Sequence, residues 1–162
     1  MAITGASAGI GRATAERCAA EGAAVVLSAR RADRLEAIAH AITSHGGRAL
    51  AVPGDVTKPD DMTTLVDRAV EAFGHLDVMI CNAGIGYHGP LDETPPSAMQ
   101  RLVDVNLMGT LYAAHAAMRV FRQQQRGHII AISSIAGRRG VGGSSLYAAT
   151  KAAQIAFIES LK

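Results

Sequence analysis

The sequence is poor in features that mark several large classes of protein. Its two cysteines, Cys18 and Cys81, stand far apart without a Cys-x-x-Cys pair, so neither a disulfide framework nor a thiolate zinc site is expected. Its six histidines are scattered and show no His-x3-His spacing, which argues against a helical metal site. We therefore expect reduced thiols and no bound metal.

Long apolar runs and an excess of charge are also missing. No apolar run approaches the roughly 20 residues that span a membrane, and Met1 leads straight into a glycine-rich turn without a charged and then apolar signal. The formal net charge is +2 and 19% of the residues are charged, which gives no indication of nucleic-acid binding. We expect a soluble, cytoplasmic chain with neither a membrane nor a nucleic acid as partner.

The residues that are present favour an α/β fold. The 162 residues are 49% apolar, enough to bury one core. Short apolar runs predict five strands, over residues 1–4, 23–29, 48–53, 76–81 and 127–134. Amphipathic stretches predict helices over residues 12–22, 30–44, 60–73 and 97–125, and from Ser144 or Ser145 as cap towards Lys162. This alternation predicts one domain over residues 1–162, a doubly wound parallel sheet that binds ligands at the carboxyl ends of its strands.

Residues 2–12 are typical of the end of a strand, a glycine-rich turn and the start of a helix. Gly5, Gly9 and Gly11 are spaced Gly-x3-Gly-x-Gly, and glycine permits backbone torsions and a close ligand approach that other residues do not. The following helix directs its free N–H groups, with their partial positive charge, at a pyrophosphate. The turn alone fits two interpretations, a dinucleotide cradle and a tight turn needed only for packing.

Tyr147 and Lys151 form a pair with a chemical mechanism. They are four residues apart near the start of the last predicted helix, so they share one helical face. A neighbouring ammonium favours the phenolate form of a tyrosine, whose oxygen then becomes a usable proton donor and acceptor. Ser134, at the end of the fifth predicted strand, is placed to hydrogen-bond the same substrate oxygen. Taken alone, such a pair is also common on solvated helices.

From its first residue to its last, the chain resembles the short-chain dehydrogenase/reductase family in its compact, single-domain form. Five ordered motifs carry the resemblance: Thr4-Gly-Ala-Ser-Ala-Gly-Ile-Gly11, Asp55-Val56, Asn82-Ala-Gly84, Asn106 in Val-Asn-Leu-Met-Gly, and Ser134 with Tyr147-Ala-Ala-Thr-Lys151. The resemblance implies a Rossmann-like sheet with strand order 3-2-1-4-5. It also implies an oxidoreductase that transfers a hydride between NADP(H) and a small-molecule carbonyl or alcohol substrate.

The resemblance implies four catalytic residues. Tyr147 would exchange a proton with the substrate oxygen, and Lys151 would bind the nicotinamide ribose. Ser134 would position the substrate oxygen, and Asn106 would hold a water that links Lys151 to solvent. Ser133 is the alternative to Ser134, which we prefer because the family's serine usually lies thirteen residues before its tyrosine.

The resemblance also implies contacts with the dinucleotide. The glycine-rich turn would surround the phosphates, Asp55 and Val56 would meet the adenine, and residues 82–84 would run beside the adenosine ribose. The implied cofactor contacts are Gly5, Ser7, Gly9, Ile10, Gly11, Arg30, Arg31, Asp55, Val56, Asn82, Ala83, Gly84, Tyr147 and Lys151.

The end of the second strand favours NADP over NAD. A carboxylate there accepts from the ribose 2′-hydroxyl of NAD, whereas the 2′-phosphate of NADP needs cations. This chain has Ala29, Arg30 and Arg31 at that place, so we predict NADP, with Arg30 as the main contact and Arg31 as a candidate second. The alternative is that both arginines are solvated charges, and Ala8 stands where the family's other common basic residue would be.

The chain departs from the family's pattern at both ends. Its first strand is short, and the sequence stops within the helix that carries Lys151, so the family's last two strands and its substrate segment are expected to be absent. Two functions stay open: an NADP-dependent oxidoreductase or the part of one that bears the catalytic residues, and a truncated, non-catalytic dinucleotide-binding or interaction protein. Excess apolar residues in the helices around 97–125 and 145–162 predict a homodimer or homotetramer.

Overall fold

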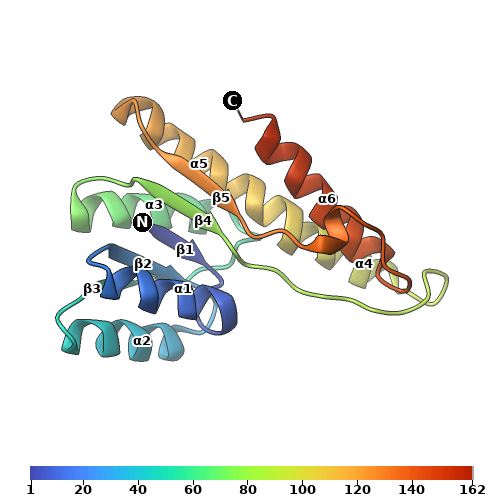
Figure 1. The fold of residues 1–162 in the computed structure, drawn as a ribbon, viewed down its shortest axis with the longest axis horizontal. Coiled ribbons are helices and arrows are strands. Elements are labelled where there is room, and N and C mark those ends of the chain that lie inside the picture. Colours follow the sequence, from blue (N-terminus) through green and yellow to red (C-terminus); the bar gives the residue numbers. More distant parts are fainter. Residues whose placement is uncertain (162) are drawn as a thin grey trace.

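The computed structural model describes residues 1–161, which form a five-stranded parallel sheet with helices on both faces (Figure 1). The strands lie in the order β3-β2-β1-β4-β5, which confirms the predicted order. Their bounds are β1 Ala2–Thr4, β2 Ala24–Ser28, β3 Arg48–Ala51, β4 Val78–Cys81 and β5 His128–Ala131.

The helices follow the strands as the alternation predicted. Their bounds are α1 Gly9–Ala20, α2 Ala32–Ser44, α3 Pro59–Phe73, α4 Pro96–Leu102, α5 Gly109–Gln124 and α6 Ser145–Glu159. A π-helical segment, η1, spans Val103–Met108, and a 3₁₀ turn, η2, spans Ile135–Gly137. Lys162, towards which the last helix was predicted to run, lies outside the described residues. None of the described helices combines the length and the apolar character needed to span a bilayer.

The core has two halves because successive side chains of a strand point to opposite faces of the sheet. On β2, Val25 and Leu27 belong to the apolar cluster that α1 and α2 cover, together with Ile3 of β1. Val26 belongs to the cluster on the other face, which α3 and α5 cover. Both faces of β1 and β2 are therefore buried, as expected of a parallel sheet, whereas β5 at the sheet edge is only partly covered.

The stretch predicted as one helix over residues 97–125 is helical throughout but changes its pitch. It runs from α4 through η1 into α5, and the π-helical part is a local widening of the kind found at functional sites. Asn106 is the buried residue of this widened segment. Immediately after it, Gly109 packs so closely that an added Cβ would lie 2.7 Å from Cγ2 of Val56. The structure therefore keeps the predicted helix but opens it around Asn106.

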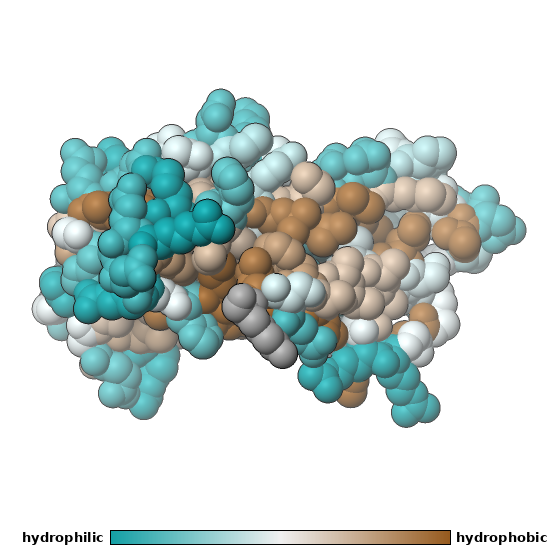
Figure 2. Space-filling model, turned by 90° about the horizontal axis from the view of Figure 1, so that it is seen from above, coloured by the Kyte–Doolittle hydropathy of each residue, from teal (hydrophilic) through white to brown (hydrophobic). Residues whose placement is uncertain are grey.

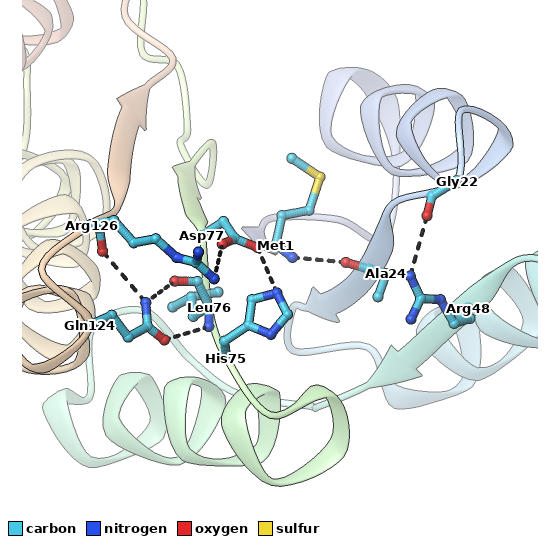
Figure 3. A network of polar contacts seen from close by, with 9 residues as sticks. All are labelled: Met1, Gly22, Ala24, Arg48, His75, Leu76, Asp77, Gln124 and Arg126. Atoms are coloured by element: carbon cyan, nitrogen blue, oxygen red, sulfur yellow. Dashed lines mark hydrogen bonds and ion pairs between the residues drawn. The ribbon is translucent and has the colours of Figure 1, made fainter.

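At the amino end of the sheet, some main-chain N–H and C=O groups form hydrogen bonds with side chains and not with a neighbouring strand. The carboxamide of Gln124 accepts from the N–H of Leu76 at 3.0 Å and donates to the carbonyl oxygen of Leu76 at 2.7 Å (Figure 3). The strand predicted to start at residue 76 therefore begins at Val78. Beside it, the Asp77 carboxylate is 3.0 Å from the ring of His75. These contacts close the end of the sheet that lies away from the glycine-rich turn.

Candidate active site

The glycine-rich turn leads from β1 into α1 and is tightly packed at Gly5 and Gly11, whereas Gly9 faces open space. Gly5 and Gly9 have φ values of +67° and +56°, which glycine adopts without strain. A Cβ at Gly5 would lie 2.8 Å from Cα of Ala83, and one at Gly11 would lie 2.4 Å from Nδ2 of Asn82. The turn thus meets the packing requirement and also leaves its main chain bare for a ligand.

The first turn of α1 carries no competing group for an anion. The residue before the helix is Ala8, no side chain caps the helix, and its first turn has no acidic residue. The free N–H groups and the positive end of the helix dipole are therefore available to a phosphate.

Asn82 and Thr4 fasten the end of β4 to the glycine-rich turn. Nδ2 of Asn82 donates to the carbonyl oxygens of Thr4 and Gly5 at 2.9 and 3.3 Å. Oγ1 of Thr4 accepts the N–H groups of Asn82 and Ala83, both at 3.1 Å. The carboxyl ends of the two central strands are held in register by these polar contacts.

A cleft of about 930 Å³ opens at the carboxyl ends of the strands, at the upper end of the volumes typical of ligand sites. Eleven of the residues predicted to contact the dinucleotide line it: Gly5, Ser7, Gly9, Ile10, Arg30, Arg31, Asp55, Val56, Asn82, Ala83 and Gly84. Gly11 is buried beneath the turn. The lining that the sequence motifs did not indicate comes partly from α4 and η1, namely Ser97, Gln100, Arg101, Asp104 and Val105.

Arg31 is the arginine that reaches the glycine-rich turn. Its Nη2 donates to Oγ of Ser7 at 2.9 Å, so a guanidinium and a hydroxyl meet at one point of the cleft wall. Arg30 also lines the cleft, and its charge acts on Asp55. Both arginines therefore border the cleft, but the side-chain contact belongs to Arg31.

Asp55 is held as a carboxylate by its own turn. Burial opposes its ionisation, but hydrogen bonds from the N–H and the hydroxyl of Thr57 outweigh burial, and Arg30 and Lys58 add to them. The pKa of Asp55 consequently lies below its ordinary value. The carboxylate lies in the cleft wall beside Val56.

Tyr147 and Lys151 lie one turn apart on α6, with Nζ of Lys151 5.8 Å from the centre of the Tyr147 ring. Lys151 is buried, and its ammonium donates to the carbonyl oxygen of Ile132 at 2.7 Å and to Oε1 of Gln154 at 3.0 Å. Burial lowers the pKa of Lys151. Tyr147 is half-buried.

Lys151 connects this pair to the cleft. Nζ lies so near Gly84 that a Cβ added there would be 3.5 Å from it. Gly84 lines the cleft, whereas Ser134, Tyr147 and Lys151 do not. The pair therefore lies at the border of the cleft, on the side formed by residues 84 and 85.

The two serines after β5 have different partners. Oγ of Ser133 donates to the carbonyl oxygen of Lys151 at 2.8 Å, which ties the chain to α6. Oγ of Ser134 accepts the N–H of Ala136 at 3.2 Å and caps the 3₁₀ turn. These contacts draw the chain out of the sheet, so the strand predicted over residues 127–134 ends at Ala131.

Asn106 is fully buried beside α6. Its Oδ1 accepts the N–H of Ile85 at 2.8 Å, and its Nδ2 donates to the carbonyl oxygen of Ile85 at 2.9 Å and to Oγ1 of Thr150 at 3.1 Å. Its main-chain oxygen accepts from the side chains of Thr110 and Gln154. Asn106 thus links η1 both to the loop after β4 and to α6.

Gln154 is a buried polar residue at this site that the sequence motifs did not indicate, as is Thr110. Gln154 lies three residues after Lys151 and is fully buried. The only available sequence signal was an amide on an otherwise apolar stretch of the last helix, which by itself does not name a partner.

The loops beyond the Tyr147 pair contact each other. The ring of His88 lies 3.1 Å from Oγ of Ser144, and the N–H of Gly89 donates to the carbonyl oxygen of Gly143 at 2.8 Å. Ser144 precedes α6 as predicted, but its hydroxyl does not cap the helix because it pairs with His88.

The two cysteines are free thiols, Cys18 half-buried and Cys81 buried. Burial raises the pKa of Cys81 to about 12. Within residues 1–161, no group of three or more His, Cys, Asp or Glu side chains is arranged to hold a metal ion.

The model of the short chain dehydrogenase family matches the chain over residues 1–162. The chain belongs to the short-chain dehydrogenase/reductase family. An uncharacterized oxidoreductase of Listeria monocytogenes is 41% identical to it over 160 residues, which make up 99% of this chain and 64% of that protein. The chain thus spans slightly less than two thirds of the length of this relative.

Solved structures share the fold closely. A 3-ketoacyl-ACP reductase from Sinorhizobium meliloti superposes with a TM-score of 0.94 and 40% identity, over 99% of this chain and 64% of that one. A metagenomic short-chain oxidoreductase in complex with NADP superposes with a TM-score of 0.91 and 35% identity, over 98% of this chain and 72% of that one. A short-chain dehydrogenase/reductase from Burkholderia phymatum in complex with NAD superposes with a TM-score of 0.94 and 30% identity, over 99% of this chain and 57% of that one. Relatives of this chain therefore hold either NADP or NAD.

Proposed function

We propose that the chain is the cofactor-binding and catalytic part of an NADP-dependent oxidoreductase that acts on a small carbonyl or alcohol substrate. One observation carries the proposal. The buried ammonium of Lys151, one helical turn from Tyr147, lies against Gly84 in the wall of a cleft with a bare helix N-terminus at its other side.

The residues of the cleft fit a nicotinamide dinucleotide. The turn at Gly5 and Gly11 leaves no space for side chains, and the uncapped start of α1 offers N–H groups to a pyrophosphate. When bound, the nicotinamide ring would supply the hydride donor or acceptor. The chain's own groups would bind the dinucleotide, orient the substrate and transfer the proton.

In this proposal each residue has a distinct task. The hydroxyl of Tyr147 gives the proton to the substrate oxygen in reduction and takes it back in oxidation. The ammonium of Lys151 favours the phenolate of Tyr147 and donates its remaining N–H to the nicotinamide ribose. Ser134 hydrogen-bonds the substrate oxygen. We assign this task to Ser134 because the hydroxyl of Ser133 is already bound to the main chain of α6.

The test compares Tyr147→Phe with Tyr112→Phe, a half-buried tyrosine of α5 outside the cleft lining. NADPH oxidation is followed with a panel of carbonyl compounds, and NADPH affinity is measured by fluorescence titration. We expect Tyr147→Phe to abolish turnover and to keep NADPH affinity, and Tyr112→Phe to keep both.

Two results would contradict the proposal. Equal turnover in wild type and Tyr147→Phe would remove the tyrosine from the chemistry. NADPH binding by the wild type without turnover of any panel compound would favour a non-catalytic dinucleotide-binding protein, the alternative that the sequence left open.

The preference for NADP is proposed from the paired contact between Arg31 and Ser7 and from Arg30 beside it. A charge-assisted hydrogen bond to a phosphate is worth about 1.5–3 kcal/mol, so Arg31→Asp should weaken NADPH binding about 10- to 100-fold. NADH affinity should stay nearly constant. Arg30→Asp should act in the same direction, and Arg34→Asp, an exposed position on α2 outside the cleft, serves as control. Unchanged NADPH affinity in both cleft variants would refute the assignment.

We also propose that the chain self-associates through a surface that includes α6 and the neighbouring edge strand β5; the contribution of α5, which the sequence also predicted, stays a prediction. Figure 2 shows apolar side chains gathered over the face where β5 and α6 lie. Among the apolar residues of these two elements, Ile130 of β5 is exposed, and Phe157 and Ile158 of α6 are only half-buried. A second copy of the chain would remove this apolar surface from water. Light scattering at micromolar concentration should report a dimer or tetramer, and a monomer would count against the proposal.

A further inference from the structure

The buried carboxamide of Gln154 lies between Lys151 of α6 and the π-helical segment η1. Its Oε1 accepts from Nζ of Lys151 at 3.0 Å. Its Nε2 donates to the main-chain oxygen of Asn106 and to Oγ1 of Thr110, both at 2.7 Å. All the polar groups of this side chain are engaged, and none is exposed to water.

The partner of Gln154 on η1 is a main-chain oxygen in the π-helical segment. The Asn106 oxygen also accepts from Oγ1 of Thr110 at 2.9 Å, so both of its lone-pair directions are taken by side chains. The two donors of the Asn106 carboxamide are likewise used, by Ile85 and Thr150.

We propose that Gln154 is a positioning residue for Lys151, which it joins directly to the π-helical segment. Its oxygen fixes the direction of the ammonium, and its nitrogen anchors that oxygen to Asn106. The effect on turnover rests on the proposed function, whereas the coupling of Gln154 to Lys151 does not.

The chemistry of an amide explains why this contact matters. The ammonium has three N–H donors, of which Ile132 and Gln154 take two, so the third is left for the side where Gly84 lies. Burial disfavours the charged form of Lys151. A carboxamide oxygen stabilises the ammonium without titrating itself, so the contact adds no second titration to that of Lys151.

Few other groups compete for this role. Tyr147, with its ring centre 5.8 Å from Nζ, is the titratable side chain that α6 brings next to Lys151. The groups that the neighbouring segments present to the ammonium are the main chain at Ile132 and Gly84 and the Asn106 carboxamide, none of which titrates.

The experiment titrates Lys151 directly through the ¹³C chemical shift of its Cε, in the wild type and in two variants. Gln154→Leu removes the acceptor, so the pKa of Lys151 should fall by about one pH unit, because a hydrogen bond to a charged group is lost. Gln154→Glu puts a carboxylate at the same distance, so the pKa of Lys151 should rise. Opposite shifts from two variants of similar size are not expected of a residue that merely fills space.

Thr110→Val is the matched control. It removes the other partner of the Gln154 nitrogen but leaves the contact with Lys151, so it should lower the melting temperature and leave the Lys151 titration unchanged. If Gln154→Leu does not fold, Gln154→Glu carries the test alone. A Lys151 titration that stays at its wild-type position in every folded Gln154 variant would overturn the inference.

Kinetics separate this inference from the proposed function. Where the wild type turns over, the pH profile of kcat should move in the same direction as the Lys151 titration, up for Gln154→Glu and down for Gln154→Leu. A shifted Lys151 titration in a chain without turnover would leave the coupling standing and refute the oxidoreductase. An active enzyme whose Lys151 titration is the same in the wild type and the Gln154 variants would support the oxidoreductase and refute the coupling of Gln154 to Lys151.

Discussion

The substitution Gly11→Ala tests how tightly the glycine-rich turn is built. Gly11 lies within α1 with an ordinary helical backbone, so alanine there should gain about 1 kcal/mol of helix propensity. Its Cβ, however, would lie 2.4 Å from Nδ2 of Asn82 and 2.6 Å from the carbonyl oxygen of Gly5. Overpacking costs about 1–3 kcal/mol, and the upper part of that range, about 2–3 kcal/mol, applies here because the main-chain oxygen of Gly5 cannot rotate away. The variant should be less stable than the wild type by about 1–2 kcal/mol.

A second substitution isolates the contact with Asn82. Asn82→Ala removes the closest obstructing atom but also loses the hydrogen bonds to Thr4 and Gly5, at a cost of about 1–2 kcal/mol. Residues in contact do not behave additively. The double variant should therefore be more stable than the sum of the single effects predicts, by about 1 kcal/mol.

Urea denaturation and NADPH titration on the same samples provide the assay. Gly46→Ala is the control, because Gly46 has a φ of +82° at the end of α2 with nothing within 4 Å of an added Cβ. It should cost about 1–2 kcal/mol through backbone strain alone and leave NADPH affinity intact. Gly11→Ala should lower both stability and affinity. A Gly11→Ala variant as stable as the wild type, or strictly additive effects with Asn82→Ala, would refute the reasoning.

Three further outcomes are expected. The lowered pKa of Asp55 means that its carboxylate stabilises the fold above about pH 3.8 and that this contribution is lost as the pH falls through the native value. Asp55→Asn should therefore be less stable than wild type in urea at pH 7, with the difference vanishing in acid. Ser133→Ala should lower stability by about 1 kcal/mol, whereas Ser134→Ala should mainly lower kcat. A thiol reagent should modify Cys18 in the folded chain and Cys81 only after unfolding.

The fold could be predicted because it depends on patterns that the sequence shows directly. Apolar runs of four to seven residues between amphipathic stretches leave little besides a parallel sheet with covered faces. Strand ends were harder to predict, because side chains such as Gln124 and Ser133 take over main-chain groups that would otherwise pair in the sheet.

The sequence predicted those residues of the candidate site that belong to recognisable motifs. It did not predict residues whose place in the site depends on contacts between distant segments. The cleft collects the predicted residues of four separate segments. The sequence favoured Arg30 over Arg31, but the reach of a long side chain to Ser7 depends on the angle at which α2 leaves the strand. Gln154 was not foreseen, since its two partners on η1 and α5 lie more than 40 residues away.

The buried residues beneath the cleft tolerate fewer substitutions than the exposed residues at its rim, Arg30 and Arg31. Thr4 uses one hydroxyl to serve the amides of Asn82 and Ala83, so even a valine of the same shape would strand two main-chain donors. Arg30 and Arg31 stand in solvent at the rim and carry no part of the core. Under the proposed function, the preference for one dinucleotide over the other can therefore change through substitutions at Arg30 and Arg31 that leave the core intact, and an exchange of cofactor would begin there.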